Sequence, residues 1–364
     1  MKGEIMYISL TPRFQFTIIA VLLLCPVMGL SQSPTVTSSL FGTTSDGKDV
    51  MLYTLTNSHG LQAEIIEFGG ALVSLEVPDR NDTFANVVRG YDSVSSYEQN
   101  AWNGTIIGRY ANRIANARFT LDGVEYILTA NSGSHQLHGG NTKAFHNVVW
   151  KSYPSHTDTE ASVRLTHLSL DGEEGYPGNL TCTVTYALTD NNELRIEYSA
   201  TTDKPTVVNF TNHSYFNLGG IGTGQIFDHE VMINADWFTD TGSDMIPTGE
   251  IRKVGTGTDF RTPKTIESQI GGLGRNGTYD HNYVLNTVSG SMILAATAYD
   301  HTTGRFMECY TDQPGMQFYT GAQTAFCFET QHFPDSPNKP HFPSTELRPG
   351  QKFESTTIYR FSAD

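Results

Sequence analysis

Charged side chains are scarce in this chain of 364 residues. Asp, Glu, Lys and Arg make up 17% of the sequence, and the acids outnumber the bases, which leaves a formal net charge of −15. No run of basic residues occurs in the chain. Nucleic acids and anionic membrane surfaces are bound chiefly through clustered Lys and Arg. The composition therefore argues against both kinds of partner.

Cysteine is also rare, with four residues in the whole chain. Cys25 falls in an N-terminal apolar segment, and Cys182, Cys309 and Cys327 each sit in an apolar, strand-like stretch. Outside that segment three cysteines remain, and an odd number of thiols cannot all pair within one chain. Buried free cysteines are therefore a simpler interpretation than a disulfide framework.

Several signatures of catalysis are missing. The sequence contains no Gly-rich phosphate loop, no Gly-x-Ser-x-Gly elbow and no His-x-x-x-His spacing. His135 and His138 are three residues apart, but no carboxylate stands beside them in the sequence. The sequence therefore favours neither a phosphate site, nor a serine nucleophile, nor a metal centre.

The N-terminus has the pattern of a secretory signal. Lys2 and Arg13 precede an apolar run from Phe16 to Leu24, and small residues follow near Gly29 and Ser31. The apolar run is too short to cross a bilayer comfortably. We expect residues 1–30 to be a cleaved signal peptide and the protein to be secreted, with a retained N-terminal membrane anchor as the alternative.

If the protein is secreted, its Asn-x-Ser/Thr sequences are candidate sites for N-linked glycans. Two of them lie inside a polar motif around His213, and a packed site there would leave both without glycan. The acceptor sequences begin at Asn81, Asn103, Asn179, Asn209, Asn212 and Asn276.

Strand patterns dominate the rest of the chain, which is rich in Gly, Thr and aromatic residues. From Leu180 to Leu188 apolar residues alternate with Thr, and a turn at 189–192 leads into a second alternating run at 194–199. This pattern predicts a hairpin with one buried and one wet face. Similar runs recur at 62–66, 72–77, 119–121, 125–128, 163–168, 292–299, 306–310 and 356–361.

Helical periodicity is limited to one or two turns at 93–99 and 263–270. No low-complexity linker and no fixed-period repeat occurs after residue 35. We therefore predict one all-β domain from about Phe41 to Phe361, built as a large antiparallel β-sandwich. The missing repeat makes a propeller less favoured.

The most informative polar segment runs from Asn209 to Leu218 and contains His213 and Tyr215. It crowds one histidine with amides, hydroxyls and aromatic rings. A polyol site needs hydrogen-bonding groups for hydroxyls, flat apolar faces for sugar C–H groups and a group that titrates near neutral pH. The segment therefore predicts a sugar site.

Three further segments carry polar groups whose roles the residues alone leave open. Arg109, Asn112 and Arg113 lie in one of them, and structural ion pairing is an alternative there, more so for Arg109. His138 precedes two glycines, which let a ligand approach closely, although a single histidine is more often structural. Asp280 precedes an apolar strand pattern and could equally be a cap or turn residue.

The last segment contains Gln317 and Glu329. Glu329 is flanked by Phe328 and other apolar residues, so a carboxylate there must be paired, hydrogen-bonded or functional. Burial would also raise the pKa of Glu329 towards a range that suits catalysis.

Six motifs occur in a fixed order along nearly the whole chain. They are Gly108-Arg109…Ala111-Asn112-Arg113-Ile114, Leu137-His138-Gly139-Gly140, Gly175-Tyr176-Pro177-Gly178, Asn212-His213-Ser214-Tyr215-Phe216-Asn217-Leu218, Asp280-His281-Asn282 and Phe328-Glu329-Thr330-Gln331. Each motif is modestly specific, and the ordered set is highly specific. Together they resemble the aldose 1-epimerase, or galactose mutarotase, family.

That resemblance implies a sugar cleft on one face of a β-sandwich and the interconversion of α and β anomers of free aldohexoses such as galactose and glucose. It implies no cofactor and no metal. By the family's pattern, Glu329 is the general base and His213 the general acid. The residues that hold the sugar are Asn112, Arg113, His138, Tyr215, Asp280 and Gln317.

One departure from the family concerns the connection between Gln317 and Glu329, which is shorter than usual and has Ala322 where Asn is expected. The depth at which Glu329 sits depends on this connection. A non-catalytic secreted carbohydrate-binding protein on the same scaffold is therefore the main alternative. An epimerase of hexose 6-phosphates is less favoured, because this acidic chain has few basic residues to spare.

Overall fold

The structure is a computed structural model that describes residues 1, 3, 33–100, 102–270, 277–288 and 290–364. The strands and helices of the described residues all belong to one compact unit, Gln32–Asp364. The signal peptide expected at residues 1–30 lies almost wholly outside the described residues and stays a prediction. Within the described part of the chain, no helix has both the length and the apolar character needed to cross a membrane.

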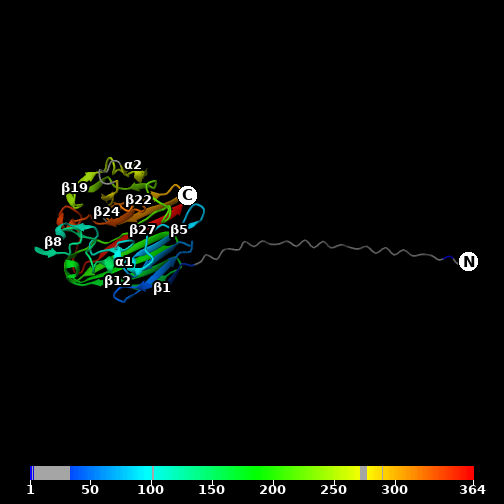
Figure 1. Cartoon of the computed structure of the whole chain (residues 1–364), viewed down its shortest axis with the longest axis horizontal. Helices are drawn as coiled ribbons and strands as arrows, with labels where there is room; N and C mark the ends of the chain where they lie inside the picture. Colours follow the sequence, from blue (N-terminus) through cyan, green and yellow to red (C-terminus); the bar gives the residue numbers. More distant parts are fainter. Residues whose placement is uncertain (2, 4–32, 101, 271–276, 289) are drawn as a thin grey trace. The chain divides into compact units, whose positions relative to one another are not determined.

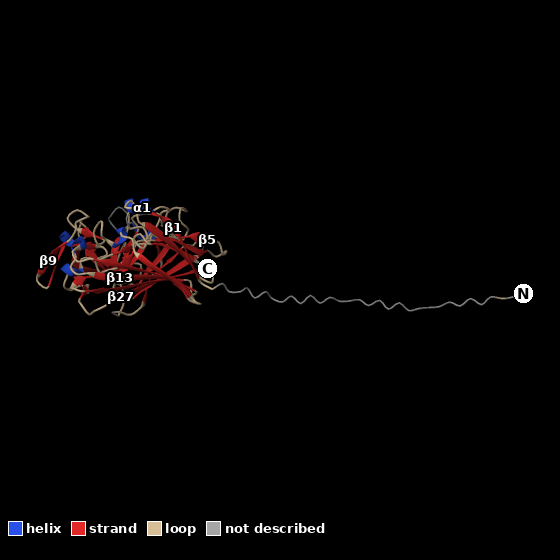
Figure 2. Ribbon diagram, turned by 90° about the horizontal axis from the view of Figure 1, so that it is seen from below, coloured by secondary structure: helices blue, strands red, loops and turns tan. Residues whose placement is uncertain are grey.

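Antiparallel strands make up most of this unit (Figure 2). The largest sheet has nine strands, and each neighbouring pair is antiparallel. In spatial order its strands are β11 (Lys151–His156), β12 (Glu160–Ser169), β13 (Leu180–Thr189), β14 (Glu193–Thr202), β27 (Phe353–Ala363), β23 (Arg305–Thr311), β22 (Ile293–Tyr299), β17 (Glu230–Ile233) and β20 (Lys264–Thr265).

Two five-stranded sheets complete the main architecture. In Figure 1, β1 (Thr35–Thr43) of the first sheet lies near the lower edge of the folded unit, and β19 (Pro247–Lys253) of the second lies near its upper edge. The first consists of β1 (Thr35–Thr43), β2 (Asp49–Thr56), β3 (Gln62–Ile66), β4 (Leu72–Pro78) and β5 (Phe84–Asn86). The second, in spatial order, consists of β19 (Pro247–Lys253), β18 (Trp237–Thr241), β21 (Asp280–Val284), β24 (Gly315–Tyr319) and β25 (Cys327–Gln331).

The remaining elements are short. Four two-stranded ladders pair β6 (Ile106–Ile107) with β16 (Thr211–Asn212), β7 (Arg113–Ile114) with β10 (Gln136–Leu137), β8 (Arg118–Leu121) with β9 (Val124–Ile127), and β15 (Thr206–Val207) with β26 (Glu346–Leu347). The helices are α1 (Val94–Gln99) and α2 (Ile266–Ile270), with single 3-10 turns at Ala115–Ala117, Phe145–Asn147, Glu173–Gly175 and Ser336–Asn338.

One continuous core joins the three large sheets. It contains Leu75 from β4, Val184 from β13 and Phe318 from β24, all without exposed surface. Burying an aliphatic or aromatic side chain of this size stabilises a fold by about 1.5–3 kcal/mol. Because each sheet turns one apolar face to the others, they pack as layers, and the predicted all-β sandwich is confirmed.

The local predictions agree well with the strands. The expected hairpin is present as β13 and β14, with Leu188 opposite Leu194, and the run predicted at 62–66 is β3.

Both predicted helical segments contain a short helix. Ser93 caps α1, because its side chain accepts a hydrogen bond from the Ser96 amide. The second helical segment is shorter than predicted, since β20 joins the edge of the large sheet before α2 begins. Three free cysteines, at 182, 309 and 327, are buried as expected.

Arg109 has the structural role that the sequence left open. The residue is 2% exposed, and its guanidinium donates to the carbonyl oxygens of Ser169, Leu170 and Pro177 and to the Ser169 hydroxyl. No carboxylate among the described residues pairs with it within 4.0 Å. Arg109 therefore ties the 169–177 loop to the segment that precedes Asn112.

We expect Arg109→Met to lower the free energy of unfolding by about 3 kcal/mol or more, because buried carbonyl groups lose their donors. Urea unfolding of the purified variant measures this loss. The matched control is Arg118→Met, whose half-exposed side chain pairs with Glu125 on the surface and which should stay within about 1 kcal/mol of the parent. Equal losses in the two variants would contradict the structural role.

Candidate active site

Polar and aromatic side chains from distant parts of the chain line one cavity at the edge of the second five-stranded sheet. The two proposed catalytic residues and the six residues proposed to hold the sugar are all among them. The lining consists of Trp102, Asn112, Arg113, Leu137, His138, His213, Tyr215, Asp280, Gln317, Tyr319 and Glu329. The structure thus brings the proposed acid, base and binding residues together.

The alternation of side chains along the strands brings Glu329, Gln317 and Asp280 to one wall of the cavity. In β25, Phe328 turns into the core while Cys327 and Glu329 face the other way. Gln317 in β24 lies directly opposite Glu329, so the two side chains share one face of the sheet. Asp280 in β21 accepts a hydrogen bond from Gln317 Nε2 at 2.5 Å. Three adjacent strands therefore supply three polar groups to the same wall.

The shortened connection before Glu329 still delivers the carboxylate to the cavity. Phe326 exchanges backbone hydrogen bonds with Phe216, at 2.7 and 2.9 Å, and so docks the end of this connection beside the His213 segment. Glu329 is only 2% exposed. The two-way backbone bridge thus holds the carboxylate next to the histidine despite the short loop.

Backbone pairing also positions His213, which follows β16 directly. Its amide donates to the Thr105 carbonyl at 3.0 Å, and its carbonyl accepts from the Gly104 amide at 2.9 Å. The imidazole stacks on Tyr215 with ring centroids 4.9 Å apart. A bonded backbone and a stacked ring leave the imidazole little freedom to rotate.

The amides around His213 support this frame rather than line the cavity. Asn212 donates to the Gly104 carbonyl and to the Tyr186 hydroxyl, and Asn209 donates to the carbonyls of Ala111 and His332. The sequence analysis expected these polar groups to serve sugar hydroxyls. Asn209 and Asn212 serve the scaffold instead, because buried backbone carbonyls need hydrogen-bond donors.

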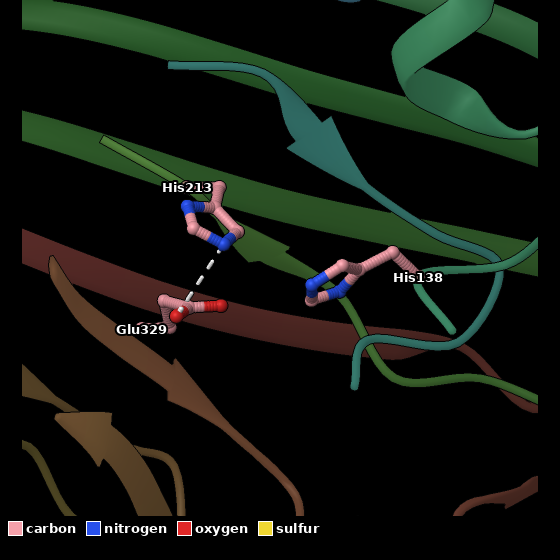
Figure 3. Close-up of side chains that lie close together, drawn as sticks. All are labelled: His138, His213 and Glu329. Carbon is pink, nitrogen blue, oxygen red and sulfur yellow. Dashed lines mark ion pairs between the residues drawn. The ribbon is translucent and has the colours of Figure 1, made fainter. Parts of the chain in front are cut away.

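Glu329 and His213 face each other in the cavity (Figure 3). Glu329 Oε1 lies 3.6 Å from His213 Nε2, and both side chains are buried. His213 Nδ1 lies 3.5 Å from the thiol sulfur of Cys327. Glu329 Oε2 is buried and has no hydrogen-bond partner among the described residues. The pair is therefore close enough to handle protons on one small ligand.

Burial pushes the pKa values of the two groups in opposite directions. It raises the pKa of the Glu329 carboxyl well above its ordinary value, and the neighbouring Asp280 adds to the rise. It lowers the pKa of His213 to about 4, with a contribution from the positive charge of Arg89. Both shifts favour the uncharged forms. Between these pKa values the pair holds one proton, carried by the carboxyl group.

The other cavity side chains are arranged as hydrogen-bonding groups. His138 Nδ1 accepts from the Asn112 amide at 3.2 Å, so the ring proton is on Nε2, the nitrogen left for a ligand. Burial lowers the pKa of His138 well below its ordinary value, which keeps the ring neutral. Arg113 Nη2 lies 3.9 Å from Asp280 Oδ2, so this wall presents both positive and negative charge.

The same cavity holds a set of atoms with metal-ligating chemistry. One ligand atom each from His138, His213 and Glu329 lie within 4.8 Å of one another (Figure 3). Two imidazoles and a carboxylate are a known zinc ligand set. His213 and Glu329 are themselves the proton-transfer pair, so a metal ion bound there would compete with that chemistry. The expectation that this protein needs no metal and no cofactor stays a prediction.

Sequence reasoning missed four side chains around this site. Trp102 and Tyr319 line the cavity, Cys327 contacts His213, and the Arg89 guanidinium lies 4.3 Å from the centre of the Tyr215 ring. Trp102 carried a usable signal, because the chain has only 3 tryptophans and this one stands in a polar, Gly-containing segment. The sequence around Cys327 and Arg89 gave no such signal, because the residues that they contact in the site come from distant segments of the chain.

Comparisons with known proteins all point to the same family. A family model described as aldose 1-epimerase matches residues 51–360. The galactose mutarotase of Bos taurus is 41% identical over 345 residues, which cover 90% of this chain and 98% of that protein. The aldose 1-epimerase of Escherichia coli K12 is 35% identical over 341 residues, covering 88% of this chain and 97% of that protein.

A solved structure shows the same fold. The galactose 1-epimerase of Lactobacillus acidophilus superposes with a TM-score of 0.80 at 25% identity, and the match covers 91% of this chain and 99% of that one. The family model and the relatives span the same region as the six ordered motifs. The chain therefore belongs to the aldose 1-epimerase family, as those motifs predicted.

Proposed function

We propose that this protein is an isomerase that interconverts the α and β anomers of free aldohexoses such as galactose and glucose. The observation that carries the proposal is the buried pair of Glu329 and His213, with Oε1 and Nε2 3.6 Å apart in a cavity lined by polar and aromatic groups. Family membership supports it, because the relatives bear the names galactose mutarotase and aldose 1-epimerase.

Ring opening needs two coordinated proton transfers. Glu329 accepts the proton of the C1 hydroxyl, the electrons of that O–H bond form the C1=O double bond, and the bond between C1 and the ring oxygen breaks. His213 donates a proton to the ring oxygen, which receives the electrons of the broken bond. Rotation about C1–C2 then presents the other face of the aldehyde, and closure returns both protons. No redox step and no covalent intermediate is involved.

For opening in this direction the shared proton must move from Glu329 to His213. A sugar hydroxyl that donates to the carboxylate stabilises its ionised form, which lowers the pKa of Glu329. The opposed pKa shifts of the pair therefore suit a reaction in which each group both gives and accepts a proton. Cavity walls that exclude water strengthen these interactions.

The remaining candidate residues would orient the sugar. Arg113 and the Nε2–H of His138 are donors placed to polarise sugar oxygens, while the Asp280 carboxylate accepts from hydroxyls. Tyr215 supports His213 by stacking. Asn112 and Gln317 complete the set of amide groups in the cavity.

We further propose that the protein is secreted after removal of residues 1–30, with a retained N-terminal anchor as the alternative. The charged start and short apolar run of the sequence support this. The partner would be a small aldose rather than a nucleic acid, given the net charge of −15.

The main test is polarimetry on freshly dissolved α-galactose. We expect acceleration over buffer, and a loss of about 10²–10⁴-fold in kcat for Glu329→Gln and for His213→Asn, because each removes one proton-transfer group. Calorimetry should show that both variants still bind galactose. The control is His156→Asn, which is exposed at the end of β11 and outside the cavity and should keep the parental kcat. Galactose binding without faster mutarotation by the parent protein would select a non-catalytic sugar-binding protein instead.

The pH dependence of kcat/KM follows from the shared proton. Below the pKa of His213, about 4, both groups are protonated and no base remains. Above the raised pKa of Glu329, both groups are deprotonated and no acid remains. We therefore expect a plateau between two limbs, with the acid limb near pH 4 and the alkaline limb well above the ordinary carboxyl range. Polarimetry across pH, corrected for buffer catalysis, measures this. An acid limb near the ordinary histidine pKa would contradict the assignment.

Secretion predicts a specific glycan pattern. Asn81 is exposed in the turn between β4 and β5. Asn103, Asn209 and Asn212 are at most 3% exposed, and the half-buried Asn179 donates its amide to Asp203 at 2.6 Å.

In a eukaryotic secretory host we expect the medium to contain protein that lacks residues 1–30 and carries glycan at Asn81. Mass spectrometry before and after enzymatic glycan removal measures both features, and Asn81→Gln is the control. Secreted protein that retains Met1, or that carries glycan at Asn209 or Asn212, would contradict the prediction. Asn276 lies outside the described residues.

A further inference from the structure

Trp102 is the cavity residue with the most unusual backbone. Its φ angle is +92°, a left-handed value that a bulky side chain rarely adopts. Such a conformation persists only where the surroundings hold it in place. The indole lines the same cavity as Glu329 and His213. A strained residue on the wall of a reactive cavity is a candidate for function.

Neighbouring contacts explain why the backbone cannot relax. The Trp102 carbonyl accepts from the Thr105 amide at 3.2 Å, and the Gly104 amide donates to the His213 carbonyl at 2.9 Å. A Cβ on Gly104 would lie 2.1 Å from the Leu72 carbonyl oxygen, so this segment is pressed against β4. The residues that follow Trp102 are therefore held between the His213 segment and β4.

The indole contacts both histidines of the site. It lies nearly parallel to His213, with ring centroids 6.5 Å apart and an interplanar angle of 21°. It meets His138 edge-on at 5.0 Å. Tyr215 stacks on His213 as well, so two aromatic rings stack with the proposed acid. Trp102 thereby gives this polar cavity an extended apolar face.

The indole N–H is the polar group of Trp102 that points to a ligand. Trp102 Nε1 is buried and has no hydrogen-bond partner among the described residues. Buried donors are nearly always paired, so an unpaired one beside a reactive pair is explained if a ligand accepts from it. A sugar offers both matching features, hydroxyl oxygens as acceptors and C–H faces that pack on an aromatic ring.

We infer that Trp102 is a sugar-contacting residue, with its indole ring against a C–H face of the aldose and its Nε1–H donated to a hydroxyl. The inference rests on the proposed function, because it assumes that the cavity binds an aldose. It adds a specificity-determining residue to the polar groups named above. Sugars that lack the accepting hydroxyl should bind less tightly.

Intrinsic fluorescence can isolate this residue. Among the tryptophans, Trp150 is 1% exposed and donates to the Phe145 carbonyl, while Trp237 is 44% exposed on β18. Trp102 alone lines the cavity. A change in tryptophan emission on sugar binding should therefore come from Trp102.

The experiment titrates galactose into the whole protein and follows tryptophan emission, with calorimetry as a separate measure of binding. We expect a saturable change in the parent and in the control Trp237→Phe, and none in Trp102→Phe. Galactose binding with an unchanged emission, or a change that survives in Trp102→Phe, would overturn the inference. If the emission change depends on Trp102 but the protein does not accelerate mutarotation, the proposed reaction is wrong and Trp102 still belongs to the sugar site.

Kinetics separate sugar contact from a purely structural role. Trp102→Ala should raise KM at least tenfold and lower kcat, because it loses both the apolar face and the donor. Trp102→Phe should recover most of kcat but keep a KM about fivefold above the parent, the value of one hydrogen bond. The unfolding midpoint is measured for each variant. Lower midpoints with a parental KM in both folded variants would contradict the inference.

Discussion

The site depends on a buried carboxylate that faces a buried imidazole. Glu329 is buried in the middle of β25, where an isolated charge would be very costly. The cost is avoided because burial raises the pKa of the carboxyl and His213 lies within 3.6 Å. The Glu329 carboxyl and the His213 imidazole thus share one transferable proton, and burial favours the neutral form of each group. That arrangement suits a reaction that only moves protons and opens a ring.

Different parts of the fold supply the two halves of this pair. The sheet of β21, β24 and β25 provides the acidic and amide wall through strand register, which aligns Gln317 with Glu329. The imidazoles come from short ladders and loops, whose backbone groups are tied down by buried side chains such as Asn212 and Arg109. Much of the polar character that marks these segments therefore serves rigidity. Rigid placement matters, because proton transfer is sensitive to shifts of about 1 Å.

Local sequence patterns predicted the strands and the all-β class because side-chain alternation along β13 reflects burial directly. The same patterns could not separate a binding amide from a scaffold amide. Asn209 and Asn212 lie in the segment that predicted a sugar site, yet the side chains of both donate to backbone carbonyls. Arg109 and Arg113 are four residues apart, yet one is a structural anchor and the other lines the cavity. Sequence spacing carries no information on which carbonyl or cavity a side chain meets.

By itself the sequence determined the fold class, the family and the identity of the proposed acid and base, since these follow from alternation and from motifs in a fixed order. Only the tertiary structure decided how these groups meet. Cys327 and His213 are 114 residues apart in sequence and lie in contact, and this depends on strand pairing and on the Phe216–Phe326 bridge. The opposed pKa shifts and the strained Trp102 beside the histidines also arise from burial and packing. Long-range contacts of this kind leave no local pattern in the chain.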